Sequence, residues 1–249
     1  MPVSESTLYM TRLELETRRL FELGKRRRLP SRSLDVGYLV HCALGELFGE
    51  QAPAPFAVTG QDRRYTQLLA YGDVPDAGLR ELAERFAMPE LFALCRWEDV
   101  KSKPMPSSWP VGTRVGFEVR ACPVVRGARH SPLERKDAEV DAFLAECWRV
   151  GKEQDVDREV VYKAWLEQQF IRSEGATLLE ARVERFQLTE LTRRTQGDER
   201  KARLKRKPDV TFRGALEVTA AEPFAALLRR GVGRHRGFGF GMLLLKPAR

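Results

Sequence analysis

Two side chains that suit proton transfer, Tyr38 and His41, lie three positions apart in this 249-residue sequence. The surrounding segment, residues 35–48, has the apolar spacing of a helix. Its apolar stripe consists of Val36, Val40, Ala43 and Leu47. Tyr38 and His41 fall on the opposite side of the helical wheel, so we expect them to be neighbours that face away from the core. Because imidazole titrates nearest to neutral pH, this pair is a candidate site for general acid–base chemistry.

A glycine-rich stretch, GVGRHRGFGFGMLLLKP at residues 231–247, is the second feature with chemical potential. It places Arg234, His235 and Arg236 among five glycines. If its second part is a strand, Gly237, Gly239 and Gly241 leave one face bare, and a sugar-phosphate backbone can approach such a face. The alternative is a tight turn between a helix and a strand, which explains Gly231 and Gly233. The stretch fails the GxGxxG pattern and the chain has no Walker A motif, so we expect no nucleotide cofactor.

Basic residues are concentrated in two clusters. The chain has 43 Lys and Arg against 35 Asp and Glu, which gives a net charge of +8 and a pI near 9.5. The first cluster contains Lys25, Arg26, Arg27, Arg28 and Arg32. The second, at residues 193–207, includes Arg193, Arg194, Arg200, Arg203, Lys205 and Arg206. Both contain or adjoin turn-forming residues, so we expect loops or a hairpin tip. Guanidinium groups fit phosphate oxygens well, so this distribution favours a nucleic-acid partner over a basic surface without one.

These features together indicate cleavage of RNA without a metal. RNA carries its own nucleophile, the 2′-hydroxyl, so the protein has to supply proton transfer, orientation and positive charge near the phosphorus. The sequence has no obvious carboxylate cluster for Mg²⁺, so we expect no metal and no cofactor. Of the other histidines, His130 is expected in a surface loop, and His235 is a candidate for phosphate contact. Two other hypotheses stay open, a non-catalytic RNA-binding subunit and a DNA-binding protein.

The elements that would position these residues follow the order β-α-β-β-α-β twice. We therefore predict an α+β fold with tandem ferredoxin-like domains and an extra helix in the second. In the first half, strands are expected at 8–15, 55–58, 65–72 and within 91–100, and helices at 35–48 and 76–87. In the second half, strands are expected at 113–125, 176–191, 209–220 and 238–247, and helices at 132–148, 157–172 and 222–230. A proline-rich break at 101–112 predicts domains at residues 1–103 and 104–249.

Three classes of protein are disfavoured by the same sequence. The chain has no run of eighteen apolar residues and no secretory signal, so we expect no membrane partner and a cytoplasmic location. The four cysteines are scattered and form no CxxC motif, which argues against a zinc site or a disulfide framework.

Three blocks of the sequence resemble CasE-type CRISPR repeat-processing endoribonucleases. They are Tyr38-Leu-Val-His41, the segment RVGFEVRACPVV and the terminal glycine-rich stretch. The resemblance implies tandem ferredoxin-like domains that hold the stem-loop of a CRISPR repeat RNA. It implies cleavage at the 3′ base of the stem without metal, by Tyr38 and His41, and retention of the product in an effector complex with other subunits. We expect the free protein to be monomeric.

The resemblance also extends the set of candidate RNA-binding residues. These include Arg120, Gly233, Arg234, His235, Arg236, Gly237 and Gly239, together with the two basic clusters. The chain departs from the family pattern at Arg120-Ala-Cys-Pro123, where the family often has Asn in place of Cys. That departure and the enlarged first cluster suggest a divergent relative, such as the repeat-processing subunit of a type IV system. In such a relative, arginines of the first cluster or of the glycine-rich stretch would share or replace the role of His41.

Overall fold

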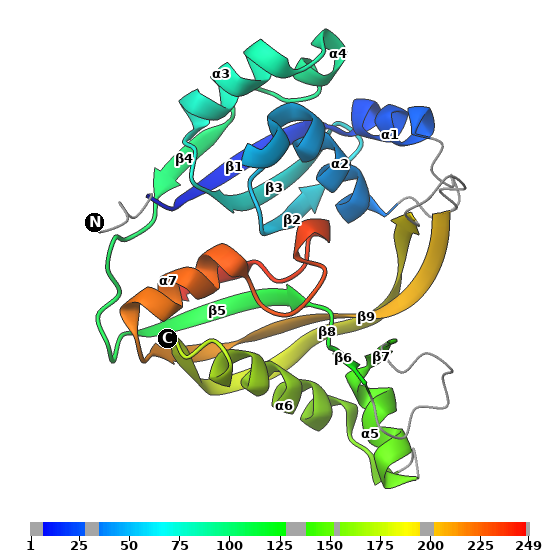
Figure 1. The fold of residues 1–249 in the computed structure, drawn as a ribbon, viewed down its shortest axis with the longest axis vertical. Coiled ribbons are helices and arrows are strands. Elements are labelled where there is room, and N and C mark those ends of the chain that lie inside the picture. The colour runs from blue at the N-terminus through cyan, green and yellow to red at the C-terminus, as the bar shows by residue number, and fades with distance from the viewer. Residues whose placement is uncertain (1–6, 28–34, 128–137, 152–154, 195–201, 248–249) are drawn as a thin grey trace.

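The computed structural model consists of two four-stranded antiparallel sheets with their helices, and it describes residues 7–27, 35–127, 138–151, 155–194 and 202–247 (Figure 1). The helices are α1 (Thr17–Arg26), α2 (Val36–Phe48), α3 (Asp76–Phe86), α4 (Pro89–Phe92), α5 (Ala142–Val150), α6 (Arg158–Ile171) and α7 (Ala221–Arg230), with 3-10 turns η2 (Gly49–Gln51) and η4 (Arg236–Phe238). The strands are β1 (Tyr9–Glu16), β2 (Phe56–Gln61), β3 (Tyr65–Gly72), β4 (Lys101–Pro104), β5 (Arg114–Ala121), β6 (Val124–Arg126), β7 (Glu139–Asp141), β8 (Ala176–Arg194), β9 (Ala202–Val218) and β10 (Leu243–Pro247).

The first sheet has the strand order β2-β3-β1-β4, and the second has the order β10-β5-β9-β8. In both, the first strand of the unit lies between its third and fourth strands, which is the order of a ferredoxin-like βαββαβ unit. The predicted α+β fold with tandem ferredoxin-like units is therefore confirmed. The small additional sheet β6-β7 and helix α5 are inserted between β5 and α6.

Alternation of apolar and polar residues accounts for the way each sheet is covered. Leu13 and Leu15 of β1 are completely buried, and they share a core with Leu39, Val40 and Leu47 of α2. Phe117 and Val119 of β5 likewise pack with α6 and α7 in a second core. Each sheet therefore buries one face under its own helices.

The N-termini of the helices show why the segment boundaries lie where they do. Asp35 accepts a hydrogen bond from the backbone nitrogen of Gly37, so it caps the N-terminus of α2. Asp157 accepts from the nitrogens of Glu159 and Val160 and caps α6 in the same way. These aspartates satisfy backbone donors that a helix leaves unpaired at its start.

Several predicted boundaries differ from the structure. Lys25 and Arg26 were expected in a loop, but they end α1, which forms because Leu20 and Leu23 are buried. The last strand of the first sheet is Lys101–Pro104 rather than a part of 91–100, because the earlier segment forms α4 and a turn. The helix expected at 132–148 begins at Ala142, and residues 128–137 lie outside the described part of the chain.

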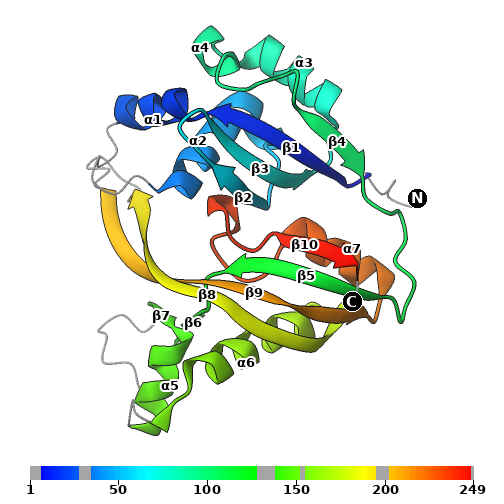
Figure 2. The ribbon, with the colours of Figure 1, turned by 180° about the vertical axis from the view of Figure 1, so that it is seen from behind.

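The two units pack against each other along a seam (Figures 1 and 2). The Tyr71 hydroxyl of β3 donates a hydrogen bond to the carbonyl of Leu243, 2.9 Å away on β10. Arg229 at the end of α7 is ion-paired with Asp73, which follows β3. Leu8 and Tyr71 also belong to the apolar core of the second unit. The seam is thus an extension of the core of the second unit, whereas the core of the first unit is a separate cluster.

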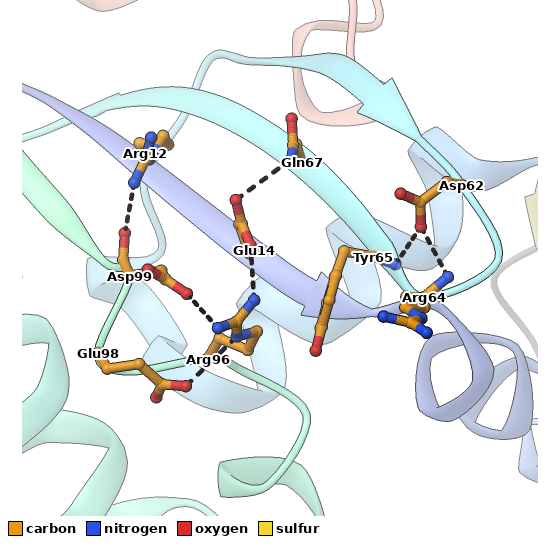
Figure 3. Close-up of polar contacts among 9 residues, drawn as sticks. All are labelled: Arg12, Glu14, Asp62, Arg64, Tyr65, Gln67, Arg96, Glu98 and Asp99. Atoms are coloured by element: carbon orange, nitrogen blue, oxygen red, sulfur yellow. Dashed lines mark hydrogen bonds and ion pairs between the residues drawn. The ribbon is translucent and has the colours of Figure 1, made fainter.

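A polar network holds the segment before β4 against β1 (Figure 3). Arg96 pairs with Glu14 at 3.5 Å and with Asp99 at 2.7 Å. Its guanidinium also lies over the ring of Tyr65, 4.6 Å from the ring centre. Gln67 of β3 donates to Glu14 at 3.2 Å. The charge of Arg96 is therefore balanced by acidic side chains, and Arg96 itself adds little to the basic surface.

Candidate functional site

Helix α2 presents Tyr38 and His41 on the side opposite to its buried residues. His41 is exposed and Tyr38 is half-buried, whereas Leu39, Val40 and Ala43 are completely buried. The ring centres of Tyr38 and His41 are 6.2 Å apart. The prediction that the two residues are neighbours is confirmed, and His41 faces away from the core as predicted, whereas Tyr38 packs partly against the core of the first unit.

Phe238, at the end of η4, packs against both rings. Its ring centre is 4.9 Å from that of His41 in an edge-on arrangement and 5.7 Å from that of Tyr38 in a stacked arrangement. Because η4 belongs to the second unit and α2 to the first, the aromatic cluster joins the two. Sequence reasoning missed Phe238, although it lies within the glycine-rich stretch that had been singled out.

Two glycines allow this close approach. A Cβ atom on Gly37 would lie 2.9 Å from the carbonyl carbon of Phe238, which is shorter than a normal contact. A Cβ atom on Gly237 would lie 3.4 Å from Nδ1 of His41, at the near edge of normal contact. Gly37 therefore lets the backbone of η4 rest directly on α2. Sequence reasoning missed Gly37, since nothing local distinguishes it from a glycine with free space around it.

The environment of His41 favours its neutral form. Partial burial lowers the pKa of the imidazole below its ordinary value of 6.5, and the positive charge of Arg27 lowers it further. Arg27 follows the last residue of α1, where its guanidinium is ion-paired with Glu46 and lies 3.9 Å from the sulfur of Cys42. An exposed imidazole that is neutral near pH 7 can accept a proton from a substrate.

The glycine-rich stretch is not the bare strand that the alternation of Gly and Phe suggested. Gly233, Gly239 and Gly241 have φ between 73° and 80°, and His235 has φ of 60°, which no strand accommodates. Residues 236–238 form η4, and the strand β10 begins at Leu243. The expected glycine ridge is therefore wrong, and the turn interpretation is correct.

The glycines of this stretch serve packing. A Cβ atom on Gly233 would lie 2.7 Å from the ring of Trp165, and one on Gly239 would lie 3.3 Å from the ring of Phe56. The absence of side chains here allows the loop to seat on α6 and on the first sheet. This is a structural reason for glycines that the sequence suggested as RNA contacts.

The carboxylate of Glu139 in β7 is the shared partner of several basic side chains. It pairs with Arg234 at 2.7 Å, with Nε2 of His235 at 3.1 Å and with Lys207 at 3.3 Å. The hydrogen bond from His235 is the main cause of a pKa for Glu139 well below its usual range. The side chain of His235 is only 4% exposed. The structure thus contradicts the expectation that His235 is presented to a phosphate, because an acid 96 positions away in the sequence holds it inside.

Arg120 of β5 is also engaged inside the protein. It donates two hydrogen bonds, at 2.8 and 2.9 Å, to the carboxylate of the completely buried Asp209. Gln187 donates a third, at 2.7 Å, and the guanidinium of Arg120 lies 4.3 Å from the ring centre of Phe240. Burial raises the pKa of Asp209, but the bonds from Arg120 and Gln187 and the charge of Arg120 lower it more, so the net shift is downward. Arg120 therefore acts as a structural ion-pair partner beneath the loop rather than as an exposed contact.

Arg236 is more available to a ligand than Arg120, because it donates a hydrogen bond to a backbone carbonyl rather than to a carboxylate. One of its nitrogens donates to the carbonyl of Arg230 at 2.7 Å. Burial lowers the pKa of Arg236, and the neighbouring charges of Arg230 and Arg234 contribute. Three guanidinium groups thus lie close together where the loop leaves α7.

Strands β8 and β9 form a long curved hairpin, whose far end reaches the level of α1 and α2 in both views (Figures 1 and 2). The second basic cluster lies on this end. Arg193 is opposite Arg203, and Leu191 is opposite Lys205, while Arg194 is opposite Ala202. Arg206 is exposed and lies 3.7 Å from Glu190. The hairpin predicted for the basic run is confirmed, and Arg200, like Arg28 and Arg32, lies outside the described residues.

The described part of the chain offers no other obvious chemistry. Within it, no group of three or more His, Cys, Asp and Glu is arranged to hold a metal ion. Of its helices, none is long and apolar enough to span a membrane.

The sequence profile of the CRISPR associated protein family matches residues 8–247. This chain belongs to that family. No curated protein is significantly similar to it in sequence.

Solved structures share the fold of this family member. A CRISPR endoribonuclease Cse3 bound to a 19-nucleotide RNA superposes with a TM-score of 0.61 at 21% identity, covering 97% of this chain and 100% of the other. Cse3 of Thermus thermophilus, bound to an RNA that represents a pre-cleavage complex, gives 0.58 at 22% identity with the same coverage. Cas6e of Escherichia coli K-12 gives 0.53 at 18% identity, covering 96% and 100%. The fold expected from the resemblance to CasE-type proteins is confirmed.

Proposed function

We propose that this protein is an endoribonuclease that cuts precursor CRISPR RNA within its repeat and uses no metal to do so. The observation that carries the proposal is the pair Tyr38 and His41, displayed outside the core against Phe238, in a fold shared with Cse3 and Cas6e. We further propose that residues 1–103 and 104–249 act as the two domains that hold the substrate between them.

The chemistry assigned to the site is an internal transesterification. His41, neutral near pH 7 because its pKa is lowered, accepts the proton of the 2′-hydroxyl next to the scissile phosphate. The 2′-oxygen forms a bond to phosphorus, and the bond from phosphorus to the 5′-oxygen breaks. The 5′-oxygen takes up a proton, for which the Tyr38 hydroxyl is our candidate donor. The products are a 2′,3′-cyclic phosphate and a 5′-hydroxyl, so atoms and charges balance without water or a cofactor.

Positive charge around this site would bind the stem of the repeat. The candidates are the end of α1 with Lys25 and Arg26, the far end of the β8-β9 hairpin, and Arg236. Arg28, Arg32 and Arg200 remain candidates by sequence alone. His235 and Arg120 drop out of the direct contacts and become supports of the loop, because Glu139 and Asp209 engage them.

Cleavage of labelled repeat RNA in EDTA tests the proposal. The wild-type protein should give a product that ends in a 2′,3′-cyclic phosphate, and His41→Ala should slow cleavage by about 10²–10⁴-fold while binding the same stem-loop. A 3′-hydroxyl product, or a requirement for Mg²⁺, would contradict the reaction class. Full activity of His41→Ala would remove the imidazole from the mechanism.

A second function is consistent with one comparison. A chain of a CRISPR RNA-guided surveillance complex shares this fold with a TM-score of 0.58 at 14% identity. We therefore also propose that the protein stays on its product as a subunit of such a complex. If the protein binds repeat RNA tightly but forms no cleavage product under any condition, it is a non-catalytic RNA-binding subunit of such a complex.

A further inference from the structure

A groove with a volume of about 940 Å³ lies between α5, α6, β6 and the start of the glycine-rich loop. Its floor is formed by small apolar side chains of Ala142, Ala145, Val161 and Ala164. Its walls carry Arg126, Arg149, Arg172 and Arg234, with the amides of Gln168 and Gln169 beside them. All of these residues belong to the described part of the chain.

The groove carries excess positive charge even after its ion pairs are counted. Arg149 pairs with Glu146 at 2.6 Å, and Arg234 and Arg126 lie near Glu139 at 2.7 and 3.7 Å. Four arginines against two glutamates leave a net charge of +2. Arg172 is exposed at the end of α6, and no described carboxylate pairs with it. A polyanion is the ligand that such a groove attracts.

The groove and the candidate active site share the glycine-rich loop, which borders both of them. Gly233 lines the groove, and Gly237 lies against His41. These two residues are four positions apart, so the connecting backbone spans at most ~14 Å. A strand of RNA that is cut beside His41 continues past the cut, and this groove offers it a basic channel at the other end of the same loop segment.

We propose that this groove binds the single-stranded RNA that continues on the 3′ side of the scissile phosphate. The inference rests on the proposed function. Arginine forks would bind successive phosphates, and the Gln168 and Gln169 amides can hydrogen-bond base edges above the flat apolar floor. An acidic protein segment could also meet four arginines. RNA is favoured because the substrate itself delivers an anionic strand to the mouth of the groove.

The test compares a short RNA that ends at the cut with an extended RNA that continues beyond the cut, on its 3′ side, as a single strand. A third RNA ends at the cut but is extended on the 5′ side of the stem. All three carry a 2′-deoxy sugar at the scissile position, so that none is cleaved. Arg149→Gln combined with Arg172→Gln should remove the preference of the protein for the extended RNA. The slope of log K against log salt should become shallower by about 1.4 for the extended RNA, at 0.7 per single-strand phosphate, and should not change for the short one.

The matched control is Arg80→Gln combined with Arg85→Gln on α3, at the opposite end of the molecule from α5 and α6 (Figure 1). Each of those arginines also pairs with a glutamate within its own helix, at 2.8 Å. The control removes the same net charge and should leave both slopes unchanged.

Three results would overturn the inference. An equal loss of affinity for the short and the extended RNA would mean that Arg149 and Arg172 contact the stem. A loss confined to RNAs extended on the 5′ side would place the wrong flank in the groove. Unchanged affinity for every RNA would mean that the groove does not bind RNA, and an acidic protein segment would become the better candidate ligand. Measurements on the wild-type protein separate failure of this inference from failure of the proposed function. If the proposed function is wrong, the wild-type protein neither binds the short stem-loop nor cleaves the unmodified repeat.

Discussion

Replacing Gly37 by alanine adds a single methyl group at the point where α2 touches the loop of the second unit. The new Cβ atom would lie 2.9 Å from the carbonyl carbon of Phe238, and the carbonyl oxygen would be closer still. Contacts between carbon atoms are comfortable at about 3.5–4.0 Å, so the shortfall is about 0.6–1.1 Å. The obstacle is backbone rather than a flexible side chain, so α2 and η4 have to move apart.

That displacement acts directly on the candidate catalytic pair, Tyr38 and His41. Phe238 contacts both Tyr38 and His41, so a shift of η4 removes the support that fixes their rings. A misplacement of about 1 Å can cost on the order of 10²-fold in rate. We therefore expect Gly37→Ala to cleave repeat RNA about a hundredfold more slowly in single-turnover assays, with stem-loop affinity nearly unchanged. Overpacking should also lower the free energy of unfolding by about 1–3 kcal/mol.

Gly45→Ala provides the control within the same helix. Nothing lies within 4 Å of a Cβ atom at Gly45, so the methyl group meets only solvent. Alanine is the better helix former, and this variant should be more stable by about 0.5–1 kcal/mol and fully active. If Gly37→Ala cleaves within twofold of the wild type while Gly45→Ala behaves as expected, the contact between α2 and η4 does not position the catalytic residues.

Three other predictions concern charges around the site. Burial, and then the charge of Arg27, lower the pKa of His41, so the rising limb of the pH profile of kcat/KM should have its midpoint below 6.5. Arg27→Gln removes one of these causes and should move the midpoint upward. A midpoint that does not move would mean that another group is the base. Glu139→Gln should destabilise the protein by about 3 kcal/mol at neutral pH, since it strands Arg234 and Lys207. Because the pKa of Glu139 is lowered, its contribution is present above its ordinary value of 4.5 and fades as the pH falls, so melting curves of the two proteins should converge in acid. Asp209→Asn should cost a similar 3–5 kcal/mol by leaving Arg120 without its buried partner, and a melting temperature equal to that of the wild type would refute this.

Local patterns were enough to predict most of the fold. The apolar stripe of α2, the aspartates that cap α2 and α6, and the alternation along β8 are all encoded within short stretches. Secondary structure of this kind follows from periodicity and capping, so it can be read without knowledge of distant partners.

The misread elements have an equally local cause. The basic run at the end of α1 hides the helical pattern, because only two large apolar side chains of α1, Leu20 and Leu23, are buried. Residues 237–241 alternate Gly and aromatic side chains as a strand would. The positive φ values at Gly239 and Gly241 nevertheless make them a turn, and glycine permits either conformation.

The site was predictable only where its residues are close in sequence. Tyr38 and His41 are one helical turn apart, so their juxtaposition follows from helix geometry. The pairs Glu139 with His235 and Arg120 with Asp209 join residues 96 and 89 positions apart. No local sequence pattern predicts such pairs. They determine which basic side chains are held inside the protein and which remain available to a ligand.

The position of Phe238 makes completion of the candidate site depend on both units. Tyr38 and His41 belong to α2 of the first unit, whereas the ring that packs against them belongs to η4 of the second. A chain in which only the first unit has folded therefore lacks this aromatic neighbour. The three rings come together only when the two units have docked.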